Sequence, residues 1–328
     1  MKPPFEITNK MMNLIVDITQ KVTRLELEQE RNLHLRKENR IRSIHSSLAI
    51  EKNTLSLEQV TDIIDGKRVL GAPKEIHEVQ NAYEAYDLVF KLNPYSVDDF
   101  LEAHGIMAKG LVSDSGKFRS GDVGVYDSDG TVIHMGARPA FVPNLVHELF
   151  EWASSDNTPD LIKSCVIHFE IEMIHPFPDG NGRMGRLWQN LVLSKWMHVF
   201  EWIPIETIVY ENQDKYYDML SAGGREGKST KFIEFMLEVI LETVLSFGIN
   251  NAVNCLSDKT IDKMSDNEVR FFNDIYPYLE ENGEIGNAKA AALSGKSSVT
   301  VRRYLVKLVE LGVLESSGEN KNRKYTLI

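Results

Sequence analysis

Apolar residues recur at helical spacing over most of the chain, and this periodicity predicts a mainly α-helical fold. Between about residues 7 and 51, charged residues separate apolar positions at Leu14, Ile15, Ile18, Val22, Leu25 and Leu27. Gly66, Gly71 and Pro73 then interrupt the pattern, as glycine and proline commonly do between elements. A second, mostly helical segment is expected from Ile76 to Lys109.

The periodicity changes between Gly116 and Pro143. The segment VGVYDSDGTVIHMG places β-branched residues on both sides of an Asp-Ser-Asp-Gly turn, which predicts a short β-hairpin. Helical periodicity returns at Asn144 and continues, with loops, to about Asn250. The expected core is therefore a helical domain that carries one small hairpin.

The chain becomes polar near residues 258 to 265, which indicates a linker. Ser265 followed by Glu268 has the spacing of a helix capping box, and two more helices, joined by a turn at Gly295, are expected next. The tail VLESSGENKNRKYTLI predicts two strands around a polar turn. This order resembles the winged helix-turn-helix fold. We therefore expect N-terminal helices at 1–75, a helical core at 76–250, a linker at 251–264 and a winged helix-turn-helix at 265–328.

The composition is that of an ordinary soluble globular protein: 328 residues, 42% of them apolar and 26% charged. No apolar run is long enough for a membrane span, and the first residues lack the pattern of a secretory signal. Cys165 and Cys255 lie far apart and form no metal-binding pattern, so a reducing cytoplasm is the expected compartment. The formal net charge of −11 argues against non-specific nucleic-acid binding by the whole chain.

The twelve residues HPFPDGNGRMGR, from His175 to Arg186, combine residue types that a catalytic or ligand-binding loop needs. The apolar helix CVIHFEIEMI ends at His175, because Pro176 and Pro178 prevent its continuation. Gly180 and Gly182 allow a sharp turn and a close approach to a ligand. A new helix begins directly after them, so the loop lies at a helix N-terminus, where free N–H groups favour an anion.

The charged residues of this loop complete the prediction. Arg183 and Arg186 are three residues apart on the new helix, so both guanidinium groups can clamp phosphate oxygens from one side. Asp179 supplies a hard oxygen ligand suited to Mg²⁺. Histidine has an unperturbed pKa near neutrality, so His175 is suited to taking a proton from a hydroxyl. A lone histidine or a lone Gly-Asn-Gly is usually structural, but their combination predicts a phosphate-handling site.

The same segment resembles the signature of the Fic family, His-x-Phe-x-Asp/Glu-Gly-Asn-Gly-Arg-x-x-Arg, and matches every fixed position. The resemblance implies a protein adenylyltransferase, in which His175 deprotonates a Ser, Thr or Tyr hydroxyl of a target protein and that hydroxyl attacks the α-phosphate of ATP. It further implies that Asp179 coordinates Mg²⁺ and that Phe177 anchors the loop. The nucleotide-binding residues that it implies are Asp179, Gly180, Asn181, Gly182, Arg183, Met184, Gly185, Arg186, Tyr216 and Tyr217.

Two further segments resemble the family more weakly. The hairpin residues Thr131, Val132, Ile133 and His134 resemble its flap, whose edge pairs with an extended substrate segment. Tyr216 and Tyr217 align with a Tyr-Tyr pair that lines the adenine pocket, although aromatic residues on a helix are as often core. Gly224 stands where some relatives have Asn, so that contact is left open.

A segment ahead of this core, SSLAIEKN from residue 46, resembles the family's inhibitory motif Ser/Thr-x-x-x-Glu-Gly/Asn. Ser47 and Glu51 fit its spacing, and the resemblance implies that Glu51 binds Arg186 in the space of the γ-phosphate. Lys52 departs from the motif, since Gly or Asn suits a left-handed helix cap. The residue is therefore expected to strain the cap, with a displaced Glu51 as one outcome.

The C-terminal unit leaves its partner open. From Met264 to Ile328 nine basic residues balance nine acidic ones, so DNA binding and protein contact are both retained. Three functions follow: an autoinhibited AMP transferase, which includes self-modification; a hydrolase that removes AMP with the same site; and a DNA-binding regulator with a nucleotide-sensing core. An intact His175 favours an enzyme. The target protein and the oligomeric state, a homodimer included, are left open.

Overall fold

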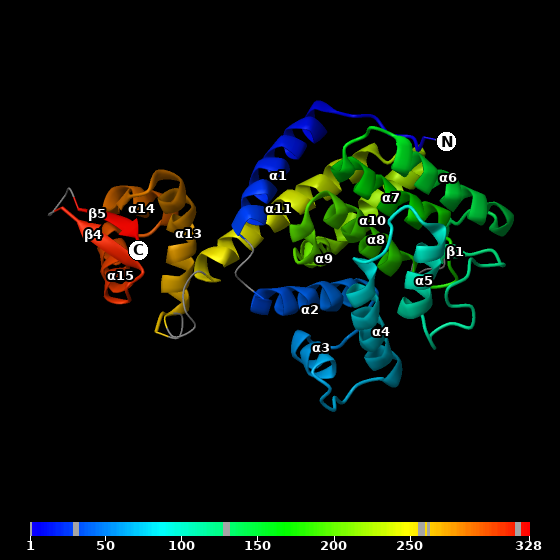
Figure 1. Cartoon of the computed structure of the whole chain (residues 1–328), viewed down its shortest axis with the longest axis horizontal. Coiled ribbons are helices and arrows are strands. Elements are labelled where there is room, and N and C mark those ends of the chain that lie inside the picture. The colour runs from blue at the N-terminus through cyan, green and yellow to red at the C-terminus, as the bar shows by residue number, and fades with distance from the viewer. Residues whose placement is uncertain (1, 29–32, 127–131, 255–259, 261–262, 319–322) are drawn as a thin grey trace. The chain divides into compact units, whose positions relative to one another are not determined.

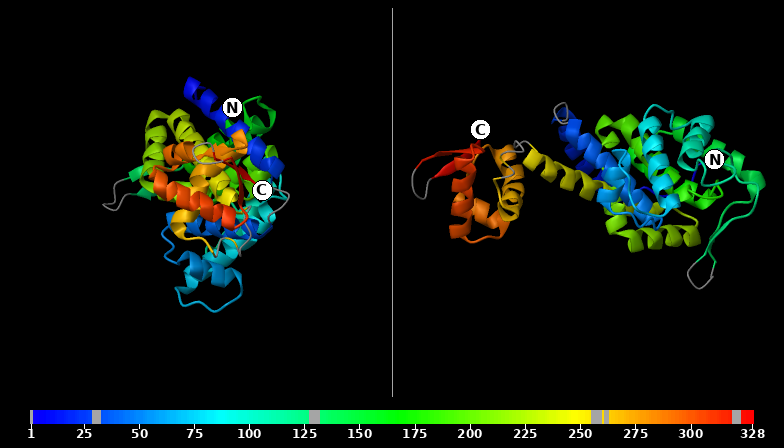
Figure 2. Two further views of the ribbon diagram at one scale, coloured as in Figure 1. Left: turned by 90° about the vertical axis from the view of Figure 1, so that its left-hand side faces the viewer. Right: turned by 90° about the horizontal axis from the view of Figure 1, so that it is seen from below.

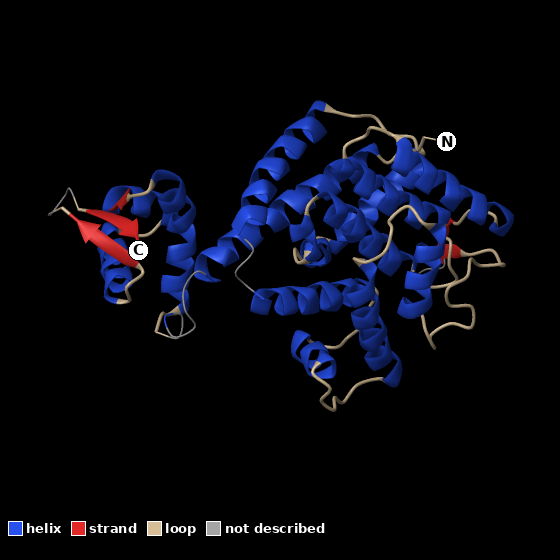
Figure 3. Cartoon of the chain, in the orientation of Figure 1, coloured by secondary structure: helices blue, strands red, loops and turns tan. Residues whose placement is uncertain are grey.

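The computed structural model describes residues 2–28, 33–126, 132–254, 260, 263–318 and 323–328. It divides the chain into two compact units, Met1–Val244 and Leu245–Ile328. Both units are mostly helical, as the periodicity predicts, and the strands are few and short (Figure 3). The division between the units lies inside helix α11, and the four-part division expected from the sequence stays a prediction.

The first unit is a helical domain with one two-stranded sheet (Figure 1). Its elements in chain order are α1 (Asn9–Glu28), α2 (Leu33–Ile50), α3 (Leu57–Ile64), α4 (Pro73–Val89), α5 (Val97–Met107), β1 (Gly124–Tyr126), β2 (Val132–Met135), η2 (Pro139–Phe141), α6 (Val142–Ser155), α7 (Asp160–Ile174), α8 (Asn181–Trp196), η3 (His198–Glu201), α9 (Ile205–Glu211), α10 (Gln213–Glu226) and α11 (Thr230–Asn254).

The centre of this unit is the antiparallel pair α7 and α8. Both helices are buried around most of their circumference, which is why their sequences show little amphipathic pattern. Phe100 of α5 packs against Trp188 of α8 with ring centroids 4.9 Å apart and against Phe177 of the intervening loop at 5.1 Å. Aromatic packing of this kind fixes the loop between α7 and α8 to the core.

Helix α2 lies across α9 and α4 and ends near the α7–α8 loop (Figure 1). The guanidinium of Arg40 stacks on Trp202 at 4.6 Å and donates to the Tyr86 carbonyl, so it joins α2 to α4 and to the turn ahead of α9. The Ser56–Gln59 capping box begins α3. These contacts give the end of α2 a fixed direction.

The mostly helical segment predicted from Ile76 to Lys109 is confirmed, and the structure divides it at residues 90–96, between α4 and α5. Helix α4 ends with Phe90 as its C-cap. Ser96 caps α5 by accepting a hydrogen bond from Asp99 N at 3.1 Å. The Pro94–Ser96 pair was a readable signal for this break.

The second unit contains α13 (Asp266–Asn282), β3 (Ile285–Gly286), α14 (Asn287–Ser294), α15 (Ser298–Glu310), β4 (Leu314–Ser317) and β5 (Lys324–Leu327). The predicted Ser265–Glu268 capping box and the turn at Gly295, with φ 63°, are confirmed. Three antiparallel strands in the order β3-β5-β4 pack on the helices around Phe271, Ile275 and Leu305. The sequence predicted only two of these strands, because β3 is two residues long and pairs with a distant segment.

Figure 2 gives two further views of the same elements. In the described parts of the chain, no helix has both the length and the apolar character that crossing a bilayer requires.

Candidate active site

The loop between α7 and α8 begins and ends in left-handed backbone. His175 follows α7 with φ 53° and ψ 61°, an uncommon conformation for a residue with a side chain. Its N–H donates to Ile171 O at 2.9 Å, which closes the helix. Gly180, with φ 85°, then caps the start of α8. The predicted helix end at His175 is confirmed. Helix α8 begins at Asn181, two residues earlier than expected, so Gly182 lies inside its first turn.

Asn181 braces the loop from inside. Its Oδ1 accepts from Phe177 N at 2.8 Å, and its Nδ2 donates to Phe177 O at 2.9 Å. Phe177 itself is fully buried and stacks on His104, with ring centroids 3.6 Å apart. The Asn181 side chain therefore fixes the shape of the loop.

Arg183 is buried but incompletely paired. Its Nη2 lies 3.4 Å from Asp179 Oδ1, while Nε and Nη1 have no hydrogen-bond partner among the described residues. Buried donors of a charged group are normally paired, and here they lie beside the free N–H groups of the α8 N-terminus. This arrangement favours an anion, with the half-exposed Asp179 carboxylate at its edge.

Arg186, the second arginine of the motif, lies on α8 and is held by the end of α2 and the turn after it. Its Nη2 donates to Glu51 Oε1 at 2.8 Å and to Ser47 O at 3.0 Å, and its Nε donates to Ser47 Oγ at 3.1 Å. Burial lowers the pKa of Arg186, but the adjacent Glu51 carboxylate more than offsets this and raises the pKa above its ordinary value. Glu51, which was expected near Arg186, therefore contacts it directly, and Ser47 of the same motif does so as well.

Lys52 adopts the left-handed conformation in spite of its side chain, with φ 69°. The turn that follows α2 holds it there: Lys52 N donates to Ala49 O at 2.9 Å, and Asn53 Nδ2 donates to Glu78 at 2.9 Å. The strain expected from Lys52 is present, but it does not displace Glu51.

The two adjacent tyrosines of α10 lie in different environments. Tyr216 is fully buried, and its hydroxyl lies 2.9 Å from His168 Nε2 and 3.1 Å from Glu172 Oε1. Tyr217 is 43% exposed and donates to Ile50 O at 3.3 Å, at the end of α2. Of the predicted adenine-lining pair, only Tyr217 has a surface open to solvent.

The glycines of α8 allow close approach. A Cβ on Gly182 would overlap Glu51 Oε1 and lie 3.1 Å from Arg186 Nη1, and one on Gly185 would lie 2.8 Å from His168. The Met184 side chain is fully buried. Gly182 thus faces the space beside Glu51 and Arg186, which we call the anion pocket, whereas Met184 and Gly185 face the core.

Sequence reasoning missed Arg119, which lies ahead of β1. The guanidinium donates to His175 O at 2.6 Å, to Gly121 O at 2.8 Å and to Ala137 O. It thereby ties the left-handed turn at His175 to both ends of the hairpin. The residues GKFRS around it carry no pattern that predicts this role, because every acceptor is a backbone carbonyl.

The predicted hairpin is present as β1 paired with β2, with Val125 opposite His134. Thr131 lies outside the described residues, and Val132, Ile133 and His134 are described in their backbone only. Within the described residues this sheet has two strands, so β2 pairs with β1 along one edge.

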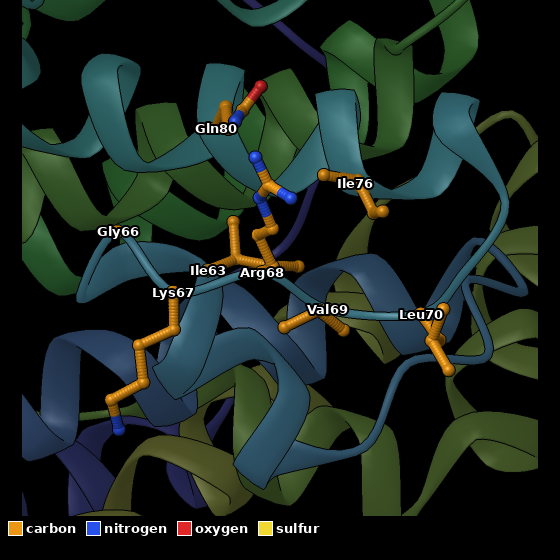
Figure 4. Close-up of a pocket in the computed structure, with 8 residues that line it drawn as sticks. All are labelled: Ile63, Gly66, Lys67, Arg68, Val69, Leu70, Ile76 and Gln80. Atoms are coloured by element: carbon orange, nitrogen blue, oxygen red, sulfur yellow. The ribbon is translucent and has the colours of Figure 1, made fainter.

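A separate pocket of about 460 Å³ lies between α3, the loop after it and α4, and none of the residues His175 to Arg186 lines it. Figure 4 shows its apolar residues Ile63, Val69 and Ile76, with Arg68 directed toward α4. This pocket is therefore not part of the site that the residues from His175 to Arg186 form.

The fold and the loop together define a helical domain built around a glycine-rich anion site. Residues 94–193 match the sequence profile described as the Fic/DOC family. The crystal structure of a Fic family protein from Desulfovibrio desulfuricans G20 superimposes with a TM-score of 0.73 at 36% identity, covering 100% of this chain and 98% of that one. The chain belongs to the Fic family, as its motif predicted.

Curated relatives match over shorter stretches. A probable protein adenylyltransferase from Aquifex aeolicus is 30% identical over 180 residues, which cover 53% of this chain and 52% of the relative. The protein adenylyltransferase Fic of Nematostella vectensis is 25% identical over 242 residues, which cover 70% and 54%. The chain spans about half the length of these two relatives.

Proposed function

We propose that the protein is a nucleotidyltransferase that moves AMP from ATP to a hydroxyl side chain of a target protein. The observation that carries this proposal is the pair of buried arginines at the α8 N-terminus. Arg183 has donors without a protein partner, and Arg186 is bound by a carboxylate that an anion can replace. The names of the curated relatives support the same reaction.

The proposed reaction is a single in-line displacement. His175 accepts the proton of the target hydroxyl as its oxygen forms a bond to the α-phosphorus, and the bond to the bridging oxygen of the β-phosphate breaks. Pyrophosphate leaves, and its charge is balanced by Arg183 and Arg186. The backbone N–H groups of Gly180 and Gly182 are proposed to orient the phosphates. Catalysis rests on positioning and charge, since no covalent enzyme intermediate is needed.

Asp179 is the proposed residue for Mg²⁺. In the described residues no cluster of three or more His, Cys, Asp or Glu side chains is present. A single carboxylate fits this ion in nucleotide sites, because Mg²⁺ takes its remaining ligands from phosphates and water. When bound, it would neutralise phosphate charge.

The contact of Glu51 with Arg186 supports autoinhibition. A carboxylate on this guanidinium competes with the γ-phosphate for the same donors, so ATP would bind with its α-phosphate turned away from attack. The edge of β2 is the proposed docking site for the target segment, through main-chain hydrogen bonds that are indifferent to sequence.

For the second unit we propose a winged helix that binds DNA. Between Asn287 and Val309 there are five basic residues and no acidic ones, whereas residues 266–284 hold six acidic residues and one basic. Arg302 and Arg303 of α15 are exposed. The net charge of the second unit is therefore near zero only because acidic residues elsewhere balance this basic segment. The basic segment favours DNA over a protein partner.

The reaction is tested with purified protein and ATP labelled at the α-phosphate. Label should appear on protein in a Glu51→Gly variant and vanish in Glu51→Gly/His175→Ala, since loss of a positioned base costs ~10²–10⁴-fold. Retention of near-normal transfer in the double variant would remove His175 from the mechanism. Loss of label from a pre-modified target, with no gain on any protein, would instead identify the AMP-removing hydrolase.

A further inference from the structure

Glu172 of α7 lies beside the anion pocket and has no place in the reaction proposed above. Its Oε1 is 3.3 Å from the position of a Cβ on Gly182, the point where Glu51 Oε1 and Arg186 Nη1 also meet. Two carboxyl groups and one guanidinium therefore converge on a single small volume. The protonation of Glu172 decides whether the net charge of that volume favours an anion.

The hydrogen bonds behind Glu172 fix where the protons lie. Gln189 donates through Nε2 to Cys165 Sγ at 3.5 Å, which turns Gln189 Oε1 toward His168 Nδ1 at 2.6 Å. His168 is fully buried, and burial lowers its pKa to about 3, so the ring is neutral. Its one N–H is therefore on Nδ1, and Nε2 is an acceptor.

Tyr216 has one hydroxyl hydrogen and two neighbours. It lies 2.9 Å from His168 Nε2 and 3.1 Å from Glu172 Oε1. Since His168 Nε2 can only accept, the Tyr216 hydrogen points to it. The contact with Glu172 is then a hydrogen bond only if the carboxyl group supplies the proton.

We propose that Glu172 is a positioning residue that Tyr216 holds in its protonated form, and that the neutral carboxyl leaves the charge of Arg186 available to an incoming phosphate. This inference rests on the proposed function, because it names what tunes the same site. Ionised Glu172 would repel the terminal phosphate and compete for Arg186. The protein then binds the triphosphate better on the acid side of neutrality.

The titratable groups around Glu172 agree with this assignment. Burial, with a smaller contribution from the Glu51 carboxylate, raises the pKa of Glu172 to about 7. Arg186 opposes the shift, as does a hydrogen bond donated by Tyr216 to the ionised carboxylate, but together they do not cancel it. The groups that face Glu172 come from α7, the end of α2, α8 and α10, and they are His168, Glu51, Arg186, Tyr216 and Tyr217.

The test measures the dissociation constant of inorganic tripolyphosphate against pH in the full chain carrying Glu51→Gly. We expect roughly tenfold weaker binding near pH 8.5 than near pH 6, since one unit of pKa coupling is tenfold in affinity. Adding Glu172→Gln, which keeps the shape and an N–H donor, should leave only the pH dependence that comes from the ligand. The titration of the ligand itself is common to both proteins and cancels in their ratio.

Glu170 provides the matched control. Burial alone raises its pKa to about 7 as well, and it lies two residues away on the same helix. Glu170→Gln should leave the pH profile of binding unchanged. Superimposable profiles for the Glu51→Gly protein with and without Glu172→Gln would overturn the proposal, as would an equal effect of Glu170→Gln.

A second measurement separates this inference from the proposed reaction. The folded-state pKa of Glu172 lies above its ordinary value of 4.5, so the folded protein binds more protons between these values and loses stability as pH rises from about 4.5 to about 7. The unfolding midpoint of Glu51→Gly should fall over that range more than that of Glu51→Gly/Glu172→Gln. If transfer is absent but both pH differences are seen, the reaction is wrong and the role of Glu172 stands.

Discussion

Removal of the Glu51 carboxylate is the perturbation whose effect the structure defines most closely. The hydrogen bond from Arg186 to Glu51 is charge-assisted, 2.8 Å long and fully buried on the arginine side. Such bonds contribute about 1.5–3 kcal/mol. The Glu51 side chain is 38% exposed, so solvent screening reduces this to about 1–2 kcal/mol.

A stabilisation of this size favours the state in which Glu51 binds Arg186 by roughly 5–30-fold over the state in which Arg186 is free, since 1.4 kcal/mol is a factor of ten. Glu51→Gly should therefore raise the initial rate of label transfer from ATP by about tenfold at subsaturating ATP, or more where the α-phosphate geometry also improves. Glu51→Gln should give a smaller rise, because the amide keeps its bulk but loses the charge.

The assay is self-modification, with the exposed Glu58→Gln as the matched control. Glu58 lies seven residues away in the first turn of α3 and should have no effect. The double variant Glu51→Gly/Arg186→Ala should lose the gain, since no clamp for the γ-phosphate remains. Equal rates for the unmodified chain and Glu51→Gly would refute autoinhibition and leave the His175 chemistry untouched.

Three further outcomes are expected. Lys52→Gly should raise the free energy of unfolding by about 0.5–1 kcal/mol, because glycine has no strain at φ 69°. The same variant should lower basal transfer. An unchanged melting curve would contradict the predicted gain in stability. Asp179→Ala should raise the Mg²⁺ concentration needed for half-maximal transfer about tenfold or more, so full activity at limiting Mg²⁺ would exclude the metal assignment. Ending the chain before Met264 should leave a soluble protein that still modifies itself, and aggregation of that truncated protein would show that the second unit stabilises the first.

The parts of the site that the sequence predicted are local in the chain. Pro176, Pro178 and Gly180 act on their own backbone, so the end of α7 and the start of α8 followed from residue type alone. The contact between Glu51 and Arg186 depends on the fold, and the resemblance to the family's inhibitory motif, rather than any local residue pattern, implied it.

The parts that the sequence missed depend on contacts between distant segments. Arg119 reaches carbonyl groups of residues 18 and 56 positions away, and any residue type can present a carbonyl. Lys52 broke the local rule for a helix cap, yet the bonds of the following turn to α4 hold it in place. Asn181 was expected among the nucleotide-binding residues, and only the structure reveals that its side chain also braces the backbone of Phe177.

The proposed inhibition by Glu51, a residue of the same chain as the pocket, has a kinetic consequence. A competitor in the same chain is present at a fixed effective concentration, in the millimolar range for a short tether, however dilute the protein becomes. Inhibition of this type cannot be relieved by dilution or by turnover of an inhibitor protein. It responds instead to whatever changes the docking of α2, or to ATP raised roughly 5–30-fold above the concentration that half-fills the pocket when Glu51 is absent, which would make the resting output of the protein a readout of nucleotide supply.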